Sequence, residues 1–287
     1  MQLDEYKAHR KSVTTSKGEV AYAEFGDGPA AVFVHGVFMN GFVWRNVIEG
    51  VKDIRRCIAI DLPAHGETKV EAENLGLKAH ADLIAEVSDK LELGEIDLVG
   101  NDTGGAICQL FAVDQPDRLR SLTLTNCDVN ENLPPEAFQG TVDLALAGEL
   151  APAISAIAND INAARSEAGM GLGYEHPEKL SDEEVFAFLG YFREEEAGRS
   201  LERRIASIAS HGNELVEIEP KLRKLDVPTL IVWGTNDQFF GLEWAYWLKD
   251  RIPGVTEVVE IEGGKLFFID ERADEMIPYL RKHWEAR

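Results

Sequence analysis

The sequence predicts an α/β protein with a mostly parallel sheet, helices on both faces of that sheet, and a long helical insertion between two of its strands. Three observations predict this class. Near-continuous apolar runs alternate with segments of helical periodicity, which is typical of parallel strands joined by helices. The N-terminal stretch instead alternates polar and apolar residues, as an antiparallel hairpin does. Residues 131–211 contain no strand-like run.

Strands are expected where short apolar or β-branched runs lie between turn signals. Two such turns are Lys17-Gly18 and Gly26–Pro29, near the N-terminus. The expected strands are Lys11–Thr15, Glu19–Phe25, Ala30–Val34, Cys57–Leu62, Ile96–Gly100, Ser121–Asn126, Thr229–Gly234 and Glu257–Ile261. Helical periodicity predicts, among others, the helices Ala79–Leu91, Gly105–Val113, Leu242–Asp250 and Ala273–Ala286.

The break in the strand–helix alternation predicts the domain organisation. A chain of 287 residues is long enough for one large α/β domain or for a core with an inserted subdomain. We expect residues 1–130 and 212–287 to form the core. We expect residues 131–211 to form a helical subdomain, with a glycine-rich break at Gly169–Gly173.

The composition limits the classes of partner. A net charge of −22, from 51 acidic against 29 basic residues, repels nucleic acid and anionic membrane surfaces. No apolar run is long enough to span a bilayer, and the start MQLDEYKAHRKS has no signal-peptide core. We therefore expect a cytoplasmic protein that binds a small molecule and neither nucleic acid nor membrane. The oligomeric state stays open.

Cysteines and glycine-rich motifs give no sign of a cofactor. Cys57, Cys108 and Cys127 each lie in an apolar segment, which favours buried free thiols over disulfides or a metal site. The sequence contains no zinc-like His/Cys spacing, no phosphate-binding Gly-rich Lys loop and no dinucleotide fingerprint. We expect no cofactor and no metal.

The stretch LVGNDTGG places an acid, Asp102, between a strand and a helix, with Gly100 and Gly104 on either side. Small residues at these positions allow a sharp turn that pushes the central side chain out above the sheet. The N–H groups at the helix N-terminus stabilise a negative charge there. Asp102 is also in place to cap the following helix, but a cap does not need glycine on both sides.

Three segments carry a resemblance to a known family: VFVHGVFMNGFVWRNVIEGV, RRCIAIDLPAHGET and LVGNDTGGA. Together they resemble the α/β-hydrolase fold, which implies a mostly parallel, doubly wound sheet of about eight strands with an inserted helical cap. Residues 131–211 correspond to that cap. An Asp at the strand–helix turn, which the family calls the nucleophile elbow, is similar to the branch of haloalkane dehalogenases and epoxide hydrolases.

The resemblance implies that Asp102 attacks carbon to form an ester, which an activated water then cleaves. It implies an oxyanion hole made by the backbone N–H groups of Val37 and Thr103. The acid that orients the base is expected at Asp237, in GTNDQFF, and Asp128, in TNCD, is a second candidate. His35 is expected to fix its loop and not to act in catalysis.

The expected histidine is missing, because the segment EGGKLFF places Leu266 at its position. The nearest downstream histidine is His283, in the final helix and expected on its surface. His176 and His211 lie where each could approach the cleft from the cap, although a solvated loop histidine is the favoured interpretation of both. His65 fits a loop position without a catalytic role.

Two further departures concern the substrate. The residues Thr103 and Val37 stand where the halide clamp of haloalkane dehalogenases is expected. Tyr174 and Tyr191 lie in the cap region and are candidates for the tyrosines that polarise an epoxide oxygen, although ordinary packing also explains them. The aromatic residues expected to line an apolar cleft are Phe38–Trp44, Phe239, Phe240, Phe267 and Phe268.

Three classes of function remain open. The first is a hydrolase in which Asp102 is the nucleophile towards a small to medium apolar substrate. The second is a lyase or isomerase in which Asp102 is a general base. The third is a ligand-binding protein without catalysis, or a variant in which Leu266 replaces a histidine and traps the ester.

Overall fold

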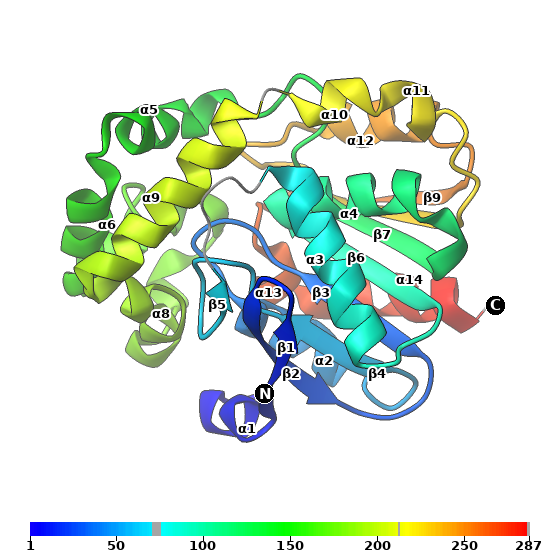
Figure 1. The fold of residues 1–287 in the computed structure, drawn as a ribbon, viewed down its shortest axis with the longest axis horizontal. Coiled ribbons are helices and arrows are strands. Elements are labelled where there is room, and N and C mark those ends of the chain that lie inside the picture. The colour runs from blue at the N-terminus through cyan, green and yellow to red at the C-terminus, as the bar shows by residue number, and fades with distance from the viewer. Residues whose placement is uncertain (71–75, 212, 286–287) are drawn as a thin grey trace.

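The computed structural model describes residues 1–70, 76–211 and 213–285. A central sheet carries helices on both faces, and a group of helices lies beyond one end of it (Figure 1). The strand order is β1-β2-β4-β3-β6-β7-β8-β9, with β5 paired to β2. The pairs made by β2 are antiparallel, and all other neighbours are parallel.

The nine strands confirm each predicted strand to within about two residues at either end. Their bounds are β1 Arg10–Thr15, β2 Gly18–Phe25, β3 Ala30–Val34, β4 Arg56–Ile60, β5 Lys69–Val70, β6 Ile96–Asp102, β7 Leu119–Cys127, β8 Thr229–Gly234 and β9 Val255–Ile261. The sheet has nine strands and not eight, because β5 consists of two residues and leaves no periodic signal in the sequence.

The helices of the core cover both faces of the sheet. Figure 1 shows α3 and α4 in front of the sheet and α14 behind it. Their bounds are α1 Leu3–Ala8, α2 Arg45–Glu49, α3 Leu77–Lys90, α4 Thr103–Asp114, α10 Glu214–Glu217, α11 Glu219–Leu222, α12 Leu242–Arg251, α13 Phe268–Glu271 and α14 Ala273–Glu285. Ala286, the last residue of the expected final helix, and residue 212, an expected domain boundary, lie outside the described residues.

Residues 131–211, called the helical insertion from here on, form helices and loops between β7 and β8, and none of these residues belongs to a strand of the sheet. The helices are α5 Gln139–Ala147, α6 Leu150–Asn159, α7 Ile161–Arg165, α8 Asp182–Leu189 and α9 Glu195–Ser210. The longest of them, α9, packs against both α5 and α6. In the described ranges no single helix is long and apolar enough to cross a membrane. Residues 136–147 and 150–159 pass such a test only as a pair bent by 118°.

A buried ionic network joins the helical insertion to the core. The guanidinium of Arg45, which begins α2, pairs with Glu184 of α8 and, at 2.6 Å, with Asp270 of α13. The hydroxyl of Tyr174 donates to the second oxygen of Asp270 at 2.9 Å. Because a partner removed from a buried charge pair leaves the other charge unpaired, this network resists separation of the two parts.

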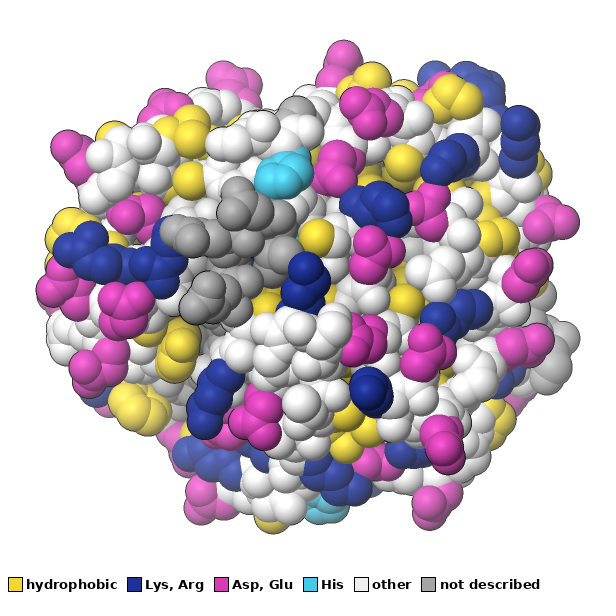
Figure 2. Space-filling view, viewed as in Figure 1, with side chains coloured by type: hydrophobic (Ala, Val, Ile, Leu, Met, Phe, Trp, Pro, Cys, Tyr) yellow, Lys and Arg dark blue, Asp and Glu magenta, His cyan; other side chains and the backbone are white. Residues whose placement is uncertain are grey.

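The sheet interior is apolar, as the near-continuous strands predict. All five residues of β3 are buried, and each buried Val or Phe stabilises the fold by roughly 1.5–3 kcal/mol relative to an exposed one. Cys57, Cys108 and Cys127 are buried free thiols, as expected. On the face seen in Figure 2, acidic and basic side chains are interspersed, so the excess of negative charge does not gather in one patch there.

Candidate active site

Asp102 occupies a strained turn between β6 and α4. Its φ of 57° and ψ of −137° are rare for a residue with a side chain, and such a conformation costs on the order of 1–3 kcal/mol. Glycines make the turn possible. A Cβ at Gly36 would lie 2.2 Å from the Asp102 carboxylate, and one at Gly104 would lie 2.3 Å from the Val34 carbonyl oxygen. The predicted reason for these small residues is therefore present in the geometry.

The two backbone N–H groups predicted as an oxyanion hole point at the Asp102 carboxyl group. The N–H of Val37 donates to Oδ2 at 3.0 Å, and the N–H of Thr103 donates to Oδ1 at 2.7 Å. Thr103 is also the first residue of α4, so Asp102 caps that helix as well. Each carboxylate oxygen thus has one fixed donor.

Burial and hydrogen bonding oppose each other at Asp102. Burial raises its pKa to about 6, while the N–H groups of Thr103 and Val37 and the nearby Arg204 guanidinium limit the rise. A carboxyl group with this pKa is mostly ionised at pH 7. Asp102 is therefore a carboxylate held in an apolar environment.

Asp128 lies beside Asp102, directly after the neighbouring strand β7. Asp102 pairs with Cys127 across β6 and β7, and Asp128 is the next residue. Its side chain is buried, and its Oδ2 accepts no hydrogen bond from any described residue. Burial and the Asp102 charge raise the pKa of Asp128 well above its ordinary value. Asp128 is thus the carboxyl group of this pair that favours its protonated form.

Asp237 follows β8, where the acid was expected, but it contacts an amide and not a histidine. Its carboxylate accepts hydrogen bonds from Asn126 Nδ2 at 2.7 Å and from the Phe239 N–H at 2.9 Å. The neighbouring Asn236 N–H donates to the Gly264 carbonyl at 2.9 Å, which joins this loop to the one that carries Leu266. Burial raises the pKa of Asp237 to about 7.

Leu266 is buried and contributes an apolar side chain to the cavity wall. Its carbonyl accepts a hydrogen bond from Asn101 Nδ2 at 3.1 Å, so its backbone is attached to the strand that carries Asp102. Among the residues that the structure describes, no histidine lines the cavity. The position that the resemblance gives to a base therefore holds a side chain that cannot accept a proton.

The histidines considered from the sequence lie elsewhere. The His35 ring bonds the Gly36 carbonyl through Nδ1 and accepts from the Leu62 N–H through Nε2, so it fixes its loop. His65 is buried, with Nδ1 at 3.0 Å from the Pro63 carbonyl. His176 is half-exposed beside Glu178, and His211 is exposed. The expectation that His283 lies on the surface is wrong, because its side chain is buried, with Nδ1 3.4 Å from the Thr256 hydroxyl.

The two candidate tyrosines are not brought to Asp102. The Tyr174 hydroxyl is held by Asp270, and Tyr191 is largely exposed, packed edge-on against Phe192. Neither belongs to the residues that line the cavity next to Asp102. The structure gives neither hydroxyl access to a substrate bound at Asp102.

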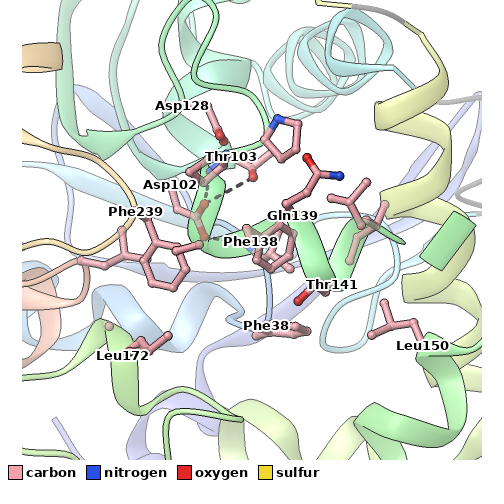
Figure 3. Close-up of a pocket in the computed structure, with 18 of the residues that line it drawn as sticks. Phe38, Asp102, Thr103, Asp128, Phe138, Gln139, Thr141, Leu150, Leu172 and Phe239 are labelled. Atoms are coloured by element: carbon pink, nitrogen blue, oxygen red, sulfur yellow. Dashed lines mark hydrogen bonds between the residues drawn. The ribbon is translucent and has the colours of Figure 1, made fainter. Parts of the chain in front are cut away.

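Asp102 lies at one end of a cavity of about 480 Å³ between the core and the helical insertion (Figure 3). Phe38, Phe239, Phe240 and Phe267 line it as expected, whereas Phe42, Trp44 and Phe268 are buried in the core instead. The helical insertion supplies most of the remaining wall, largely as Leu, Ile, Val and Ala. Gln139, Thr141 and Glu167 add polar groups to it.

Arg204 is a functional candidate that the sequence reasoning missed. This α9 side chain is fully buried, and its charge acts on both Asp102 and Asp128. Its two terminal nitrogens donate to no described residue, while Nε lies 3.3 Å from His80 Nε2. The signal was present: Leu201, Arg204, Ile205 and Ile208 follow helical spacing, so an arginine stands on the apolar face of α9.

Metal ligands are not gathered anywhere in the described ranges: no group of three or more His, Cys, Asp or Glu side chains there is arranged to hold a metal ion.

Comparison with known proteins places the chain among hydrolase-fold proteins. It is 24% identical to the dihydrolipoyllysine-residue acetyltransferase component of the acetoin cleaving system of Cupriavidus necator, over 98% of this chain and 75% of that protein. It is 32% identical to haloalkane dehalogenase 2 of Mycobacterium bovis, but over only 39% of this chain and 40% of the relative. That second match spans less than half of either protein.

Solved structures share the fold over almost the whole chain. The epoxide hydrolase CorEH superposes with a TM-score of 0.79 at 19% identity, covering 96% of this chain and 98% of its own. An alpha/beta hydrolase fold protein from Burkholderia ambifaria gives 0.81 at 20% identity, covering 94% and 96%. The sequence profile of the alpha/beta hydrolase fold matches residues 29–272. With the elbow, the sheet order and this match together, the chain belongs to the α/β-hydrolase-fold family.

Proposed function

We propose that the protein is a hydrolase in which Asp102 attacks an electrophilic carbon of a small to medium apolar substrate and forms an ester. The observation that carries this proposal is the Asp102 carboxylate in the wall of a largely apolar cavity, held by the N–H groups of Val37 and Thr103. The likeness to haloalkane dehalogenase 2 and to the epoxide hydrolase fold supports the same chemistry.

The elbow suits both half-reactions of such an enzyme. In the first, an Asp102 oxygen is already ionised and needs no base in order to attack. In the second, water adds to the ester carbonyl and negative charge develops on its oxygen. Each Asp102 oxygen has a backbone N–H beside it, so whichever oxygen becomes the ester carbonyl keeps a donor for this charge. Removal of such a donor typically costs about 10²–10³ in rate.

The helical insertion acts, in this proposal, as the cap of the site. It supplies the apolar wall opposite Asp102 and keeps bulk water from the ester. An alkyl or aryl group up to roughly the size of a drug-like ligand fits such an apolar cavity. Haloalkanes are disfavoured as natural substrates, because Val37 and Thr103 provide no side-chain halide clamp.

A second candidate function is a lyase or isomerase in which Asp102 removes a proton. It is favoured by one observation, the rise of the Asp102 pKa to about 6, which lies close to the operating pH of a general base. A ligand-binding protein without catalysis does not need the strained conformation at Asp102, and this argues against the third class.

Covalent labelling tests the proposal. The protein is incubated with 1-bromohexane or 1,2-epoxyhexane and quenched with acid, and intact-mass and peptide analysis locate the adduct. We expect one alkyl group on Asp102, and none on Asp102→Asn. The exposed Asp117→Asn serves as the matched control for loss of one carboxylate. If neither electrophile labels Asp102 and neither is converted to product, the nucleophile is excluded and the general base becomes the leading assignment.

A further inference from the structure

A second carboxyl group lies in the same cavity, and attack by Asp102 alone gives it no role. Figure 3 shows Asp128, Thr103 and Asp102 next to one another at one end of the cavity. The register of β6 and β7 explains this placement, because Asp128 follows the residue paired with Asp102, and neighbouring strands lie about 4.8 Å apart.

The hydrogen-bond donors are divided unequally between the two carboxyl groups. Asp102 receives two backbone N–H groups. Asp128 has an Oδ2 to which no described residue donates, and its buried side chain is one of those that line the cavity. The donors therefore hold the negative charge on Asp102 and leave the proton on Asp128.

The charges around the pair point the same way. The groups that act on Asp128 are Asp102 of β6, Arg204 of α9 and the Thr103 side chain, and Cys127 and Asp237 lie in the same cluster. Arg204 is the cation that both carboxyl groups share, and it pairs directly with neither of them among the described ion pairs. Two neighbouring carboxyl groups with one distant cation hold one proton between them near neutral pH.

We propose that Asp128 is the acid and the base of the reaction, giving a proton to the leaving oxygen as Asp102 attacks and taking one from the water that cleaves the ester. This inference rests on the proposed function. It gives the chain a proton carrier in place of the absent histidine and of the two tyrosines, whose hydroxyl groups do not reach the cavity.

The first step balances for a substrate with an oxygen leaving group, such as an epoxide. A bond forms between an Asp102 oxygen and the substrate carbon, and the bond between that carbon and the ring oxygen breaks. The proton of Asp128 passes to the ring oxygen, which becomes a hydroxyl. The products are a neutral ester at Asp102 and a carboxylate at Asp128.

The second step returns both groups to their starting state. Because the ester has lost the negative charge of Asp102, Asp128 remains ionised next to Arg204 and accepts a proton from water. The water oxygen bonds to the ester carbonyl carbon, and the backbone N–H beside the oxygen that did not attack, that of Val37 or of Thr103, holds the oxyanion. Collapse breaks the bond to the alkoxy oxygen, which takes the second proton of that water. The sum is epoxide plus water giving the 1,2-diol.

If Asp128 donates a proton, its effect on the rate of attack depends on the leaving group. Bromide leaves as a stable anion and needs no proton, whereas the oxygen of an unactivated epoxide does. A protonated Asp128 therefore accelerates attack on 1,2-epoxyhexane and not attack on 1-bromohexane, although the two carry the same chain.

The test compares the rates at which the two compounds label Asp102 in the whole protein and in Asp128→Asn, which keeps the size of the side chain. General acid catalysis is worth about 10²–10⁴-fold, so we expect labelling by the epoxide to fall by at least about 100-fold. Labelling by the bromide should stay unchanged, and its ester should persist longer in the variant. A melting curve that matches that of the unchanged protein establishes that the variant is folded.

A pH profile of the unchanged protein gives a second measurement that needs no variant. Labelling by the epoxide should decline as pH rises through the pKa of Asp128, while labelling by the bromide should rise to a plateau. An equal effect of Asp128→Asn on both compounds, or parallel pH profiles, would overturn the role of Asp128 and leave the nucleophile intact. If the unchanged protein is labelled by neither compound and consumes neither, the nucleophile is excluded, and the role of Asp128 with it.

Discussion

Two loops at the same edge of the sheet differ in how much of a hydrolase site they hold. The turn between β6 and α4 has a complete elbow, with a strained Asp102, glycines around it and two N–H donors. In the loop after β9, the Leu266 carbonyl accepts a hydrogen bond from Asn101, so the backbone is attached to the strand of Asp102. The side chain at this position is leucine, where the family resemblance expects a histidine. Under the proposed function, the groups needed for attack are therefore present at Asp102, whereas the base expected for ester cleavage is absent from the Leu266 position.

The largest effect is expected from Asp102→Asn, which breaks the complete half of the comparison. An amide is too weak a nucleophile to form the ester, so turnover and labelling should fall on the order of 10⁴-fold or more. The rate of hydrolysis of an epoxide panel and the mass of the quenched protein measure this. If the variant keeps its activity, a group other than Asp102 must be the nucleophile.

Leu266→His restores the missing half of the comparison. A base at this position, oriented by Asp237, should accelerate cleavage of the ester by about 10²–10⁴-fold. The decay of the hexyl ester, followed by mass spectrometry, measures the rate. Leu266→Met is the matched control, since it keeps an apolar side chain of similar volume. Equal decay in both variants would contradict the prediction. It would show either that the side chain at position 266 does not face the ester, or that Asp237 stays hydrogen-bonded to Asn126 and does not orient the new histidine.

The charge of Arg204 sharpens the electrostatic side of the comparison. Its guanidinium lowers the pKa of Asp102, so Arg204→Met should raise that pKa above about 6. Attack needs the carboxylate, so the acid limb of the labelling profile with 1-bromohexane should move to higher pH, by about one unit. At pH 6 the rate should therefore fall several-fold, while the plateau at high pH changes little. An unchanged pH profile would show that the charge of Arg204 does not affect the pKa of Asp102.

Asp237 gives the smallest effect, on stability. Its pKa of about 7 in the folded protein lies above that of an unfolded aspartate, so the folded state holds the extra proton. This contribution is present at low pH and is lost as the pH rises through 7. Asp237→Asn should therefore reduce the loss of stability between pH 5 and pH 8 by about 1–3 kcal/mol. Urea unfolding at both pH values measures it, and an unchanged difference between them would contradict the assignment.

Much of the fold and of the elbow could be predicted from the sequence. A short, continuous apolar run such as Ala30–Val34 predicts a strand that is buried on both faces of a parallel sheet. The two-residue β5 could not be predicted, because it is too short to leave a pattern. The turn at Asp102 could be predicted because glycine neighbours are a local signal of a strained backbone. The N–H donor of Val37 followed from the same loop motif.

Other parts of the site depend on tertiary packing, which leaves little trace in the local sequence. The sequence leaves the Tyr174 hydroxyl free to contact a substrate, but in the fold this hydroxyl donates to Asp270, which also pairs with Arg45. The charge of Arg204 acts on Asp102 only because the fold brings α9 near β6, two elements that are far apart in the sequence. The Asp128 carboxyl group was one of two acids at strand ends, and only the register of β6 with β7 puts it beside Asp102.

The ionic network at Arg45 has a consequence for the route by which a substrate arrives. Its ion pairs and the Tyr174 hydrogen bond hold α8 and the Tyr174 segment against α2 and α13, so this side of the helical insertion is bonded to the core. On the other side, Leu144 and Leu146 of α5 are exposed to solvent and also line the cavity. Under the proposed function we therefore expect an apolar substrate to enter past α5, because the exposed side chains at that part of the cavity wall are apolar, and to reach Asp102 from there.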